Sequence, residues 1–510
     1  MGAMDERQFR SHVETLAFDK TLQATETQGV SIAPDTARAE AKLVSRDGTR
    51  TSPEYALGET IGEGGMGVVR LAVQTGLRRD VAIKTLRNDD HSETDRLGLL
   101  HEALVTGGLE HPNIVPIYSL SQMADGAPAM VMKRIEGISW YECMKDPARA
   151  PGFDGHDLLG WHLDVLSQVC LAVHFAHAKG IVHRDIKPEN VMLGAFGEVY
   201  LVDLGIAVPL DKAKAEYLLH ASDANWIAGS PAYMAPEMTT GKGADTGFHT
   251  DIYLLGSTLS EILSGRPPHT GSALIEVMYL AYRSDPIVAE NAPLELLEIC
   301  HKAMHPKPEK RYASADALRG ALHEYSMHRA SETLALEASS RLESLETLVT
   351  SADATVASVR GLAGEVRFGL KQAPKIWPKN AVATAAHLQW ISLMASWELK
   401  AGNLKAAERL SEELVDTPEH LLVEFAKVRD EIAKREANLQ RLEALGQEVD
   451  QAHGARFRVW GAVVAIILWT FHRAVGLRLR CSNGGSSVWT LGRARTSLLR
   501  RRISRVHNVA

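Results

Sequence analysis

The strongest chemical signal in the sequence is the run Ile-Val-His-Arg-Asp-Ile-Lys-Pro-Glu-Asn, which extends from Ile181 to Asn190. It places the carboxylate of Asp185, the ammonium of Lys187 and the carboxamide of Asn190 within six residues. Groups of these types can orient a hydroxyl, screen the charge of a phosphoryl group and ligate a metal. Asp203 follows thirteen residues after Asn190, at the end of an apolar run. Two such oxygen ligands suit Mg²⁺, which keeps bound waters and takes further ligands from substrate phosphates.

A glycine-rich run lies upstream, where residues 61–69 contain the pattern G-x-G-x-x-G at Gly62, Gly64 and Gly67. Two interpretations compete. The phosphate-binding turn of a dinucleotide site opens a helix, whereas a hairpin folded over phosphates continues as a strand. The residues after Gly67 are apolar and strand-like, so the sequence favours the hairpin. Glycine suits either site because its backbone can approach phosphate oxygens closely.

Lys84 ends the run Val-Ala-Ile-Lys, in an otherwise apolar strand-like segment. It is either a surface lysine at a strand edge or a buried lysine, and a buried lysine needs a carboxylate partner. Glu102 lies in the helical window that follows. A Lys84–Glu102 ion pair would explain both residues.

The elements that must position these residues change in type along the chain. Short apolar runs with tight turns between them predict strands in the first part. Apolar residues at spacings of three and four predict helices from about residue 155 to residue 329. The stretch 180–240 between helices reads as loops and carries most of the unusual chemistry. The expected strands are 57–61, 67–73, 80–86, 114–120 and 129–135, with one helix over 95–109.

With these motifs in this order, residues 55–328 resemble the eukaryotic-like protein kinases, and in detail the bacterial (Hanks-type) serine/threonine kinases. The resemblance implies an α+β fold, the bilobal protein kinase fold, with a β-rich small lobe and a helical large lobe. It implies ATP and Mg²⁺ as cofactors and proteins bearing Ser or Thr as substrates.

The resemblance also gives the motif residues their roles. Lys84 is expected to hold the α and β phosphates of ATP, with Glu102 as its helical partner. Asp185 matches the catalytic base, and Lys187 matches the lysine that contacts the γ-phosphate.

Metal and nucleotide binding fall to further residues of the same motifs. Asn190 and Asp203 match the magnesium ligands. The expected nucleotide-binding residues are Ile61, Gly62, Gly64, Gly67, Val69, Ala82, Lys84, Met132, Lys133 and Ile135.

Three further matches read as supports of the fold. Residues 229–237 resemble the end of an activation segment, with its Ala-Pro-Glu triplet ending at Glu237. Arg311 matches the late arginine that pairs with this glutamate. Asp251 matches the buried aspartate of the central helix.

The sequence departs from the family pattern at two places. Leu204 stands where the Asp-Phe-Gly motif has Phe, and we expect it to keep an apolar plug. Lys133 and Arg134 stand where the hinge usually has Glu and Tyr. Because backbone groups grip adenine there, we expect the change to alter inhibitor fit more than ATP use. Met132 matches the gatekeeper position.

Three function classes compete: an active serine/threonine protein kinase in signal transduction, a kinase-fold scaffold (pseudokinase) and a small-molecule kinase. A scaffold would be indicated by loss of the lysine or of either aspartate, and none is lost. The segment Ser230–Tyr233 looks like the loop that positions a peptide, which small-molecule kinases generally lack. The sequence therefore favours the active protein kinase.

Autophosphorylation is expected between Asp203 and Glu237, with Ser222 as the regulatory site. Ser230 is expected to hold the loop to Asp185 and Lys187 through its hydroxyl. Arg184 is either a receptor for the phosphate or part of a plain structural ion pair.

Composition excludes several classes for the 510-residue chain. With 45% hydrophobic and 23% charged residues it matches neither collagen-like, nor wholly disordered, nor multi-span membrane proteins. Its four cysteines lie far apart, which indicates neither a disulfide framework nor a cysteine zinc site. Residues 1–30 lack an apolar run, so we expect no signal peptide and a cytoplasmic kinase domain.

The expected organisation has five parts. A flexible leader (1–52) precedes the kinase domain (53–328) and a helical region (329–450) with apolar heptads over 342–370 and 421–442. A helical hairpin over 383–414 resembles one tetratricopeptide unit. Self-association through coiled coils is one interpretation of this region and a solvated stalk is the other.

An apolar segment (456–477) and a basic tail (478–510), expected to be disordered, end the chain. After Asp450 the sequence holds eleven arginines and no acidic residue. Its uncharged run, Val459–Phe471, is thirteen residues long, whereas a membrane-spanning helix needs about 20. Three interpretations remain: an isolated apolar patch, an interfacial anchor or half of a transmembrane helix. We expect membrane contact here and no specific nucleic-acid partner.

Overall fold

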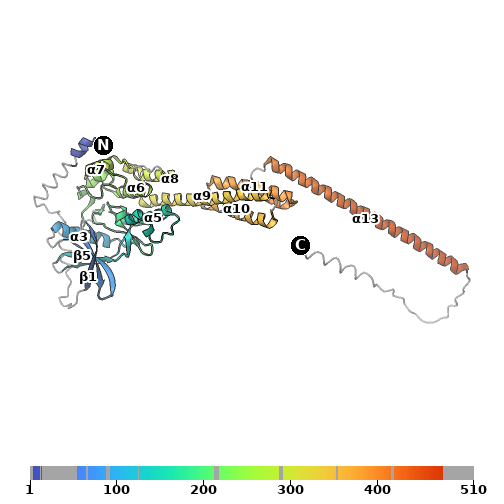
Figure 1. Cartoon of the computed structure of the whole chain (residues 1–510), viewed down its shortest axis with the longest axis horizontal. Coiled ribbons are helices and arrows are strands. Elements are labelled where there is room, and N and C mark those ends of the chain that lie inside the picture. Colours follow the sequence, from blue (N-terminus) through green and yellow to red (C-terminus); the bar gives the residue numbers. More distant parts are fainter. Residues whose placement is uncertain are drawn as a thin grey trace. The chain divides into compact units, whose positions relative to one another are not determined.

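The computed structural model describes residues 4–11, 13, 54–64, 67–87, 92–123, 126–211, 218–286, 291–351, 354–414 and 418–474. The chain forms two compact units, Met1–Trp390 and Ile391–Ala510. The first contains a sheet-rich part followed by helices, which confirms the expected α+β class for this region (Figure 1).

The sheet-rich part is one five-stranded antiparallel sheet with the strand order β1-β2-β3-β5-β4. Side chains alternate between its faces, as the period of a strand requires. On β3, Val81 and Ile83 are buried in a cluster on one face, so Ala82 and Lys84 project from the other. The strands are β1 (Tyr55–Gly64), β2 (Gly67–Gln74), β3 (Arg79–Thr85), β4 (Ile117–Gln122) and β5 (Pro128–Lys133).

Helix α3 (Glu93–Gly107) packs against β4 and β5 and carries Glu102. Its start is set locally, because Ser92 and Asp95 form a reciprocal capping box at the N-terminus. Leu99 and Ala103 share a buried cluster with Met130 of β5. The helix thus holds Glu102 above the sheet face that presents Lys84.

The helical part is built around α5 (Leu158–Ala178) and α6 (Phe248–Ser264). Leu166 and Val173 of α5 are fully buried in the largest apolar cluster, as their spacing predicted. Among the described residues, α5 alone is long and apolar enough to cross a membrane, and its burial identifies it as a core helix. The other elements are α4 (Trp140–Lys145), α7 (Leu274–Arg283), α8 (Leu294–Ala303) and the short strands β6 (Gly137–Ser139), β7 (Ile181–Val182), β8 (Val191–Gly194), β9 (Val199–Leu201) and β10 (Val208–Pro209).

The expected boundary at residue 328 lies inside a continuous helix, α9 (Ala315–Thr350). His328 of this helix stacks on Trp377 with a ring separation of 4.3 Å and approaches Glu295 of α8 at 3.0 Å. The first helices after residue 329 therefore pack onto the kinase-like region as part of the same unit.

The heptad over 342–370 does not form one continuous coiled-coil helix. The chain ends α9 at Thr350 and begins α10 at Val356, which runs to Ile376 and packs back against α9. The ion pair between Arg341 and Glu365 shows the antiparallel register. A Cβ at Gly369 would lie 2.8 Å from the Cβ of Ala338, so this glycine permits close helix contact. The two halves of the heptad thus face each other within one chain.

The second unit contains the end of α11 (Ala381–Lys400), α12 (Leu404–Ser411) and α13 (Glu419–Ala474). The expected hairpin over 383–414 corresponds to α11 and α12, and Gly402 in the turn has φ of +80°. Leu421 and Phe425 of α13 pack with Ala395, Leu399 and Ala407. The coiled coil expected over 421–442 is not confirmed, because its first residues belong to this cluster.

The apolar run Val459–Phe471 forms the last turns of α13. Its side chains are exposed, with Trp460 at 70% and Leu468 at 64% of full accessibility. The basic tail, 478–510, lies outside the described residues.

We expected residues 1–52 to be a flexible leader, and residues 6–11 differ from this expectation. Residues 6–11 are helical, and Phe9 is completely buried. The order comes from burial of this single aromatic side chain. Residues 14–52 lie outside the part of the chain that the structure describes.

Candidate active site

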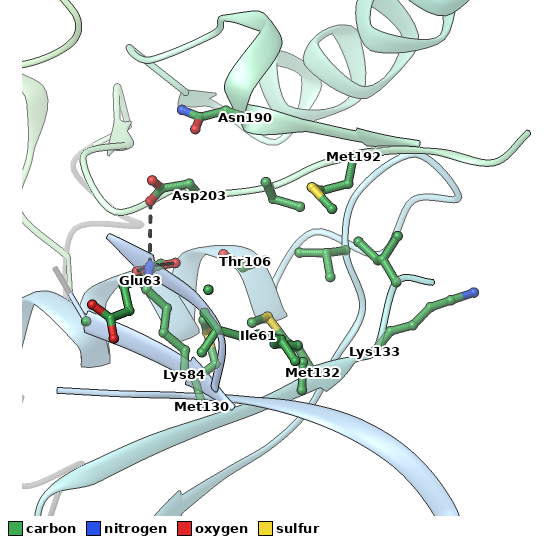
Figure 2. A pocket seen from close by; sticks show the side chains of 18 residues that line it. Ile61, Glu63, Lys84, Thr106, Met130, Met132, Lys133, Asn190, Met192 and Asp203 are labelled. Carbon is green, nitrogen blue, oxygen red and sulfur yellow. Dashed lines mark hydrogen bonds and ion pairs between the residues drawn. The ribbon is translucent and has the colours of Figure 1, made fainter. Parts of the chain in front are cut away.

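A cavity of about 470 Å³ opens between the sheet and the helical part. Figure 2 shows Lys84 and Asp203 on opposite sides of it, joined by an ion-pair contact. The volume is typical of a small-molecule or cofactor site. The sequence-predicted residues that line it are Ile61, Gly62, Gly67, Val69, Ala82, Lys84, Glu102, Met132, Lys133, Ile135, Asn190 and Asp203.

The β1–β2 hairpin forms the roof of the cavity. Gly64 pairs with Gly67 at its tip and is not among the lining residues. Gly67 has no room for a side chain, because a Cβ there would collide with the carbonyl oxygen of Thr85. The chain continues as a strand after this glycine, which confirms the hairpin over the dinucleotide-binding turn.

Lys84 and Glu102 form the predicted ion pair. The Lys84 Nζ lies 2.7 Å from both carboxylate oxygens of Glu102, and the two side chains are 12% and 4% exposed. Asp203 Oδ1 lies 3.7 Å from the same nitrogen. Burial works to lower the pKa of Lys84, but the Glu102 and Asp203 carboxylates outweigh it and raise the pKa. Lys84 is therefore a fixed positive charge at the cavity wall.

Asp185 and Lys187 lie together with Asn190, which lines the cavity, but they are not themselves among its lining residues. Lys187 Nζ is 3.1 Å from Asp185 Oδ2, and Asn190 Nδ2 donates to the same oxygen at 2.9 Å. Asn190 Nδ2 also donates to the Asp185 carbonyl oxygen at 2.8 Å. Because its amide nitrogen is engaged in this way, Asn190 offers its carbonyl oxygen as the atom that can ligate a metal.

Ser230 connects this cluster to the segment that follows. Its backbone N–H donates to Asp185 Oδ1 at 3.0 Å, and Lys187 Nζ donates to its hydroxyl at 2.5 Å. The hydroxyl thus holds Lys187, as predicted. The contact with Asp185 comes from the backbone and not from the hydroxyl.

Asp251 fixes the backbone just before Asp185. Its carboxylate accepts the N–H groups of His183 and Arg184 at 2.8 and 2.9 Å and contacts His177 Nε2 at 2.8 Å. Burial works to raise the pKa of Asp251, but these partners hold it below its usual value. Arg184 has φ of +71° and Asp203 has φ of +62°, which are left-handed conformations that cost energy in residues other than glycine. Such strain is concentrated at functional sites.

The comparisons with known proteins agree with this geometry. Residues 55–324 match the protein kinase domain, which covers more than half of the chain. The chain belongs to the protein kinase family. Its resemblance to bacterial serine/threonine kinases is confirmed by the relatives that follow.

Serine/threonine-protein kinase PknB of Mycobacterium tuberculosis is 34% identical over 284 residues, which are 53% of this chain and 42% of that protein. Serine/threonine-protein kinase PknD of Protochlamydia amoebophila is 33% identical over 288 residues, covering 52% of this chain and 29% of that protein. A probable serine/threonine-protein kinase of Corynebacterium efficiens is 32% identical over 273 residues. The match therefore spans less than half of each relative's length.

The Arg311–Glu237 pair and the apolar residue Leu204 lie as the sequence predicts. Arg311 makes a bidentate pair with Glu237, with distances of 2.7 and 2.8 Å. Burial alone would raise the pKa of Glu237, but the effect of Arg311 is larger and holds this pKa below its usual value. Leu204 is 1% exposed in the large apolar cluster, so the residue in place of Phe does act as an apolar plug.

Lys133 and Arg134, the two residues that differ from the usual hinge of the family, do not fill the cavity. Figure 2 shows the Lys133 side chain pointing away from it, and its Nζ donates to the Tyr200 hydroxyl at 2.6 Å. Arg134 pairs with Asp80. Met132, at the gatekeeper position, lines the cavity itself.

Our sequence-based set missed part of the kinase cavity wall. The missed lining residues are Glu63, Thr106, Val115, Met130, Met192 and Val202. Their position beside motif residues was a usable signal for four of them. Glu63 lies between Gly62 and Gly64 of the glycine-rich pattern. Val202 directly precedes Asp203, Met192 is two residues after Asn190, and Met130 is two residues before Met132 on one strand face.

Ser222 lies between Asp203 and Glu237, in the segment that resembles an activation segment, and Arg184 precedes this segment in the sequence. Residues 212–217 of the segment lie outside the described part. The Arg184 guanidinium lies 5.8 Å from the Trp226 ring centre, and its buried Nε has no hydrogen-bond partner. The Ser222 hydroxyl is 2.8 Å from His220 Nδ1 and donates to Asp223 at 3.2 Å. In the part of the segment that the structure describes, Ser222 makes no hydrogen bond to Arg184.

Proposed function

We propose that the chain is a serine/threonine protein kinase that uses ATP and Mg²⁺ and acts in signal transduction. The observation that carries the proposal is a pair of charged clusters that both reach the cavity. Lys84 and Glu102 line it from the sheet side, and Asn190, which contacts Asp185 beside Lys187, lines it from the helical part. All the charged groups that phosphoryl transfer requires of a protein are present.

The residues fit a magnesium ion. Asn190 can offer its carbonyl oxygen, and the Asp203 carboxylate is 43% exposed, at the cavity that Asn190 also lines. A bound Mg²⁺ would neutralise charge on the substrate phosphates. Lys84 would hold the α and β phosphates, and its carboxylate partner fixes its position.

Asp185 would accept the proton of the attacking hydroxyl. Its Oδ1 takes one hydrogen bond from the Ser230 backbone, which fixes the carboxylate orientation before substrate arrives. Lys187 lies 3.1 Å from Oδ2 and would screen the transferring phosphoryl group. Lys187 stands two residues after Asp185, and a lysine at this place favours a serine or threonine acceptor over tyrosine; its Nζ donates a hydrogen bond to Ser230. This hydrogen bond joins the segment Ser230–Tyr233, which would position a peptide, to the lysine beside Asp185, and it supports protein substrates over small molecules.

The test is to incubate the purified full chain with ATP and Mg²⁺ and a generic protein substrate, and to map phosphate by mass spectrometry. We expect phosphoserine or phosphothreonine, and none with the Asp203→Asn variant. A wild-type chain that binds ATP but transfers no phosphate would favour the scaffold. Transfer to small molecules alone would favour the third class.

We propose autophosphorylation between Asp203 and Glu237, with Ser222 as the regulatory site. A phosphate adds about −1.5 to −2 charges, and the unpartnered Arg184 Nε is a donor for it. A phosphosite map of the active chain should show Ser222. Ser222→Ala should lower the rate of substrate phosphorylation, and a map without phosphate anywhere between Asp203 and Glu237 would refute the proposal.

We propose that the kinase domain is cytoplasmic and that residues 456–471 contact a membrane. The exposed apolar side chains of this segment follow Arg456 and Arg458, which can face anionic lipid. Fractionation of cells should place the full chain with membranes and a chain ending at Gln451 in the soluble fraction. A full chain with Val464→Lys and Ile467→Lys is the matched control and should also be soluble. Recovery of the unaltered chain from the soluble fraction would refute membrane contact.

We also propose self-association through α13. Leu439 and Leu442 lie three residues apart and are 59% and 65% exposed, so they form a short apolar face. Sedimentation of the full chain in detergent should show a dimer. Leu439→Asp with Leu442→Asp should yield a monomer, and an unchanged dimer would refute this role.

A further inference from the structure

The helical segment at residues 6–11 begins with its own capping box. The Gln8 N–H donates to Asp5 Oδ1 at 2.8 Å, and the Asp5 N–H donates to Gln8 Oε1 at 3.2 Å. The cap fixes the position of Phe9, which is 0% exposed. Glu6, Arg7 and their exposed neighbours face away from the protein.

The N-terminal helical segment lies beside α7 of the same unit (Figure 1), and Phe9 is buried against this helix. Its ring centre lies 4.9 Å from that of Tyr282 and 5.7 Å from that of Tyr279. The Met4 N–H also donates to the Tyr282 hydroxyl at 3.1 Å. The contact joins residues separated by more than 270 positions in the sequence.

Helix α7 is two-sided. Met278 and Ala281 are its buried residues and face the interior. Tyr279 and Tyr282 are spaced three residues apart, so they share a different helix face. This aromatic face of α7, formed by Tyr279 and Tyr282, is called the tyrosine face below.

A helix of this length is not stable alone, because helix nucleation is unfavourable and isolated helices below about 12 residues are marginal. Its order therefore depends on the tyrosine face. Among the described residues 4–11 and 13, Phe9 is the only one that is completely buried, and one buried aromatic anchor typically dominates the affinity of a small interface. The contact should be lost when Phe9 is lost.

We propose that the tyrosine face of α7 is a docking site for a short capped helix, and that the chain's own residues 4–13 occupy it as a releasable internal ligand. Attachment to the same chain gives such a ligand an effective concentration on the order of 1 mM. An external copy of the segment at micromolar concentration cannot compete with it. The site is therefore closed to other helices while Phe9 is docked.

The location gives the site a regulatory position. Helix α7 packs against the short helix η5 (Pro236–Thr240), which carries Glu237. The tyrosine face is thus one element away from the segment that positions Ser230 against Asp185. Docking or release of residues 4–13 changes which surface of the large lobe is open to a partner.

The experiment titrates a fluorescent peptide of residues 1–13 into the full chain and follows anisotropy. The unaltered chain should show no binding at micromolar peptide, because its own segment occupies the site. The full chain with Phe9→Ala should bind the peptide at least tenfold more tightly than the unaltered chain does. The matched control is Arg10→Ala, an exposed position in the same segment, which should behave like the unaltered chain.

Two further variants assign the site. Adding Tyr279→Ala and Tyr282→Ala to the Phe9→Ala chain should abolish peptide binding, whereas adding Leu274→Ala, an exposed residue of the same helix, should not. Equal binding by the unaltered and Phe9→Ala chains would overturn the proposal. Absence of binding to the Phe9→Ala chain at 1 mM peptide would overturn it too. Because the assay needs no phosphoryl transfer, its result is independent of the proposed kinase activity.

Discussion

The buried pair of Arg311 and Glu237 offers a prediction with a magnitude that the geometry supplies. The Arg311 side chain is 0% exposed and makes two bonds to Glu237 at 2.7 and 2.8 Å. It also donates to the carbonyl oxygens of His305 and His249 at 2.8 and 2.9 Å. Arg311→Met leaves the Glu237 carboxylate buried without its partner, which typically costs about 3–5 kcal/mol.

That loss is a large fraction of the free energy of unfolding, since domains are stable by only about 5–15 kcal/mol. Glu237→Gln should cost less, because Arg311 keeps its backbone carbonyl partners. The double variant should be more stable than the sum of the single losses predicts, by about 0.5–3 kcal/mol.

The assay is hydrogen exchange of α6 amides as a function of urea, which reports unfolding of this region separately from the second unit. Arg319→Met is the matched control. Arg319 pairs with Asp316 at 2.7 Å, but the two side chains are 33% and 47% exposed. Such a pair should contribute only about 0.5 kcal/mol. If Arg311→Met costs no more than Arg319→Met, the argument from burial is wrong.

Two other predictions concern the site and pH. Ser230→Ala should lower kcat, whereas Ser230→Thr should largely keep it, because only threonine retains a hydroxyl that accepts a hydrogen bond from Lys187. Equal kcat values for the two variants in a peptide phosphorylation assay would contradict this role of the hydroxyl. Burial lowers the pKa of His162 to about 4, below its unfolded value of 6.5, and its Nδ1 accepts from Trp140. The contribution of His162 to native stability should therefore be constant above about pH 6.5 and fall by roughly 3 kcal/mol as the pH drops toward 4, measured by urea unfolding. His162→Gln should weaken this dependence, and an unchanged pH profile in that variant would refute the assignment.

The catalytic cluster could be predicted from sequence because its parts are local. Asp185, Lys187 and Asn190 lie in one run, and the structure places them in contact. The Lys84–Glu102 pair was predictable for another reason. If Lys84 is buried, it requires a carboxylate partner, and the following helix offered one.

The helical region could not be predicted to the same depth. A heptad records which residues are apolar, but it does not record where the chain reverses. The turn between Thr350 and Val356 converts the expected coil of 342–370 into an antiparallel pair. Gly369, which lies inside this heptad stretch, is a point of close contact with Ala338.

The docked N-terminal helix was missed because its partner is remote in sequence. Asp5 and Gln8 did carry a local signal, the capping box. Whether six residues stay helical depends on the tyrosine face of α7, which no local pattern reveals.

The most direct test of the proposed kinase reaction is the Asp185→Asn variant of the full chain. The substitution keeps the shape of the side chain and removes the oxygen charge that would accept the hydroxyl proton. Phosphate transfer to a protein substrate should fall by about 10²- to 10⁴-fold. The Kd for ATP, measured with a fluorescent analogue, should stay within about threefold of the value for the unaltered chain, because Lys84 and Glu102, which would hold the nucleotide, are unchanged. Phosphate transfer close to that of the unaltered chain would contradict the role of Asp185 and, with it, the proposed mechanism.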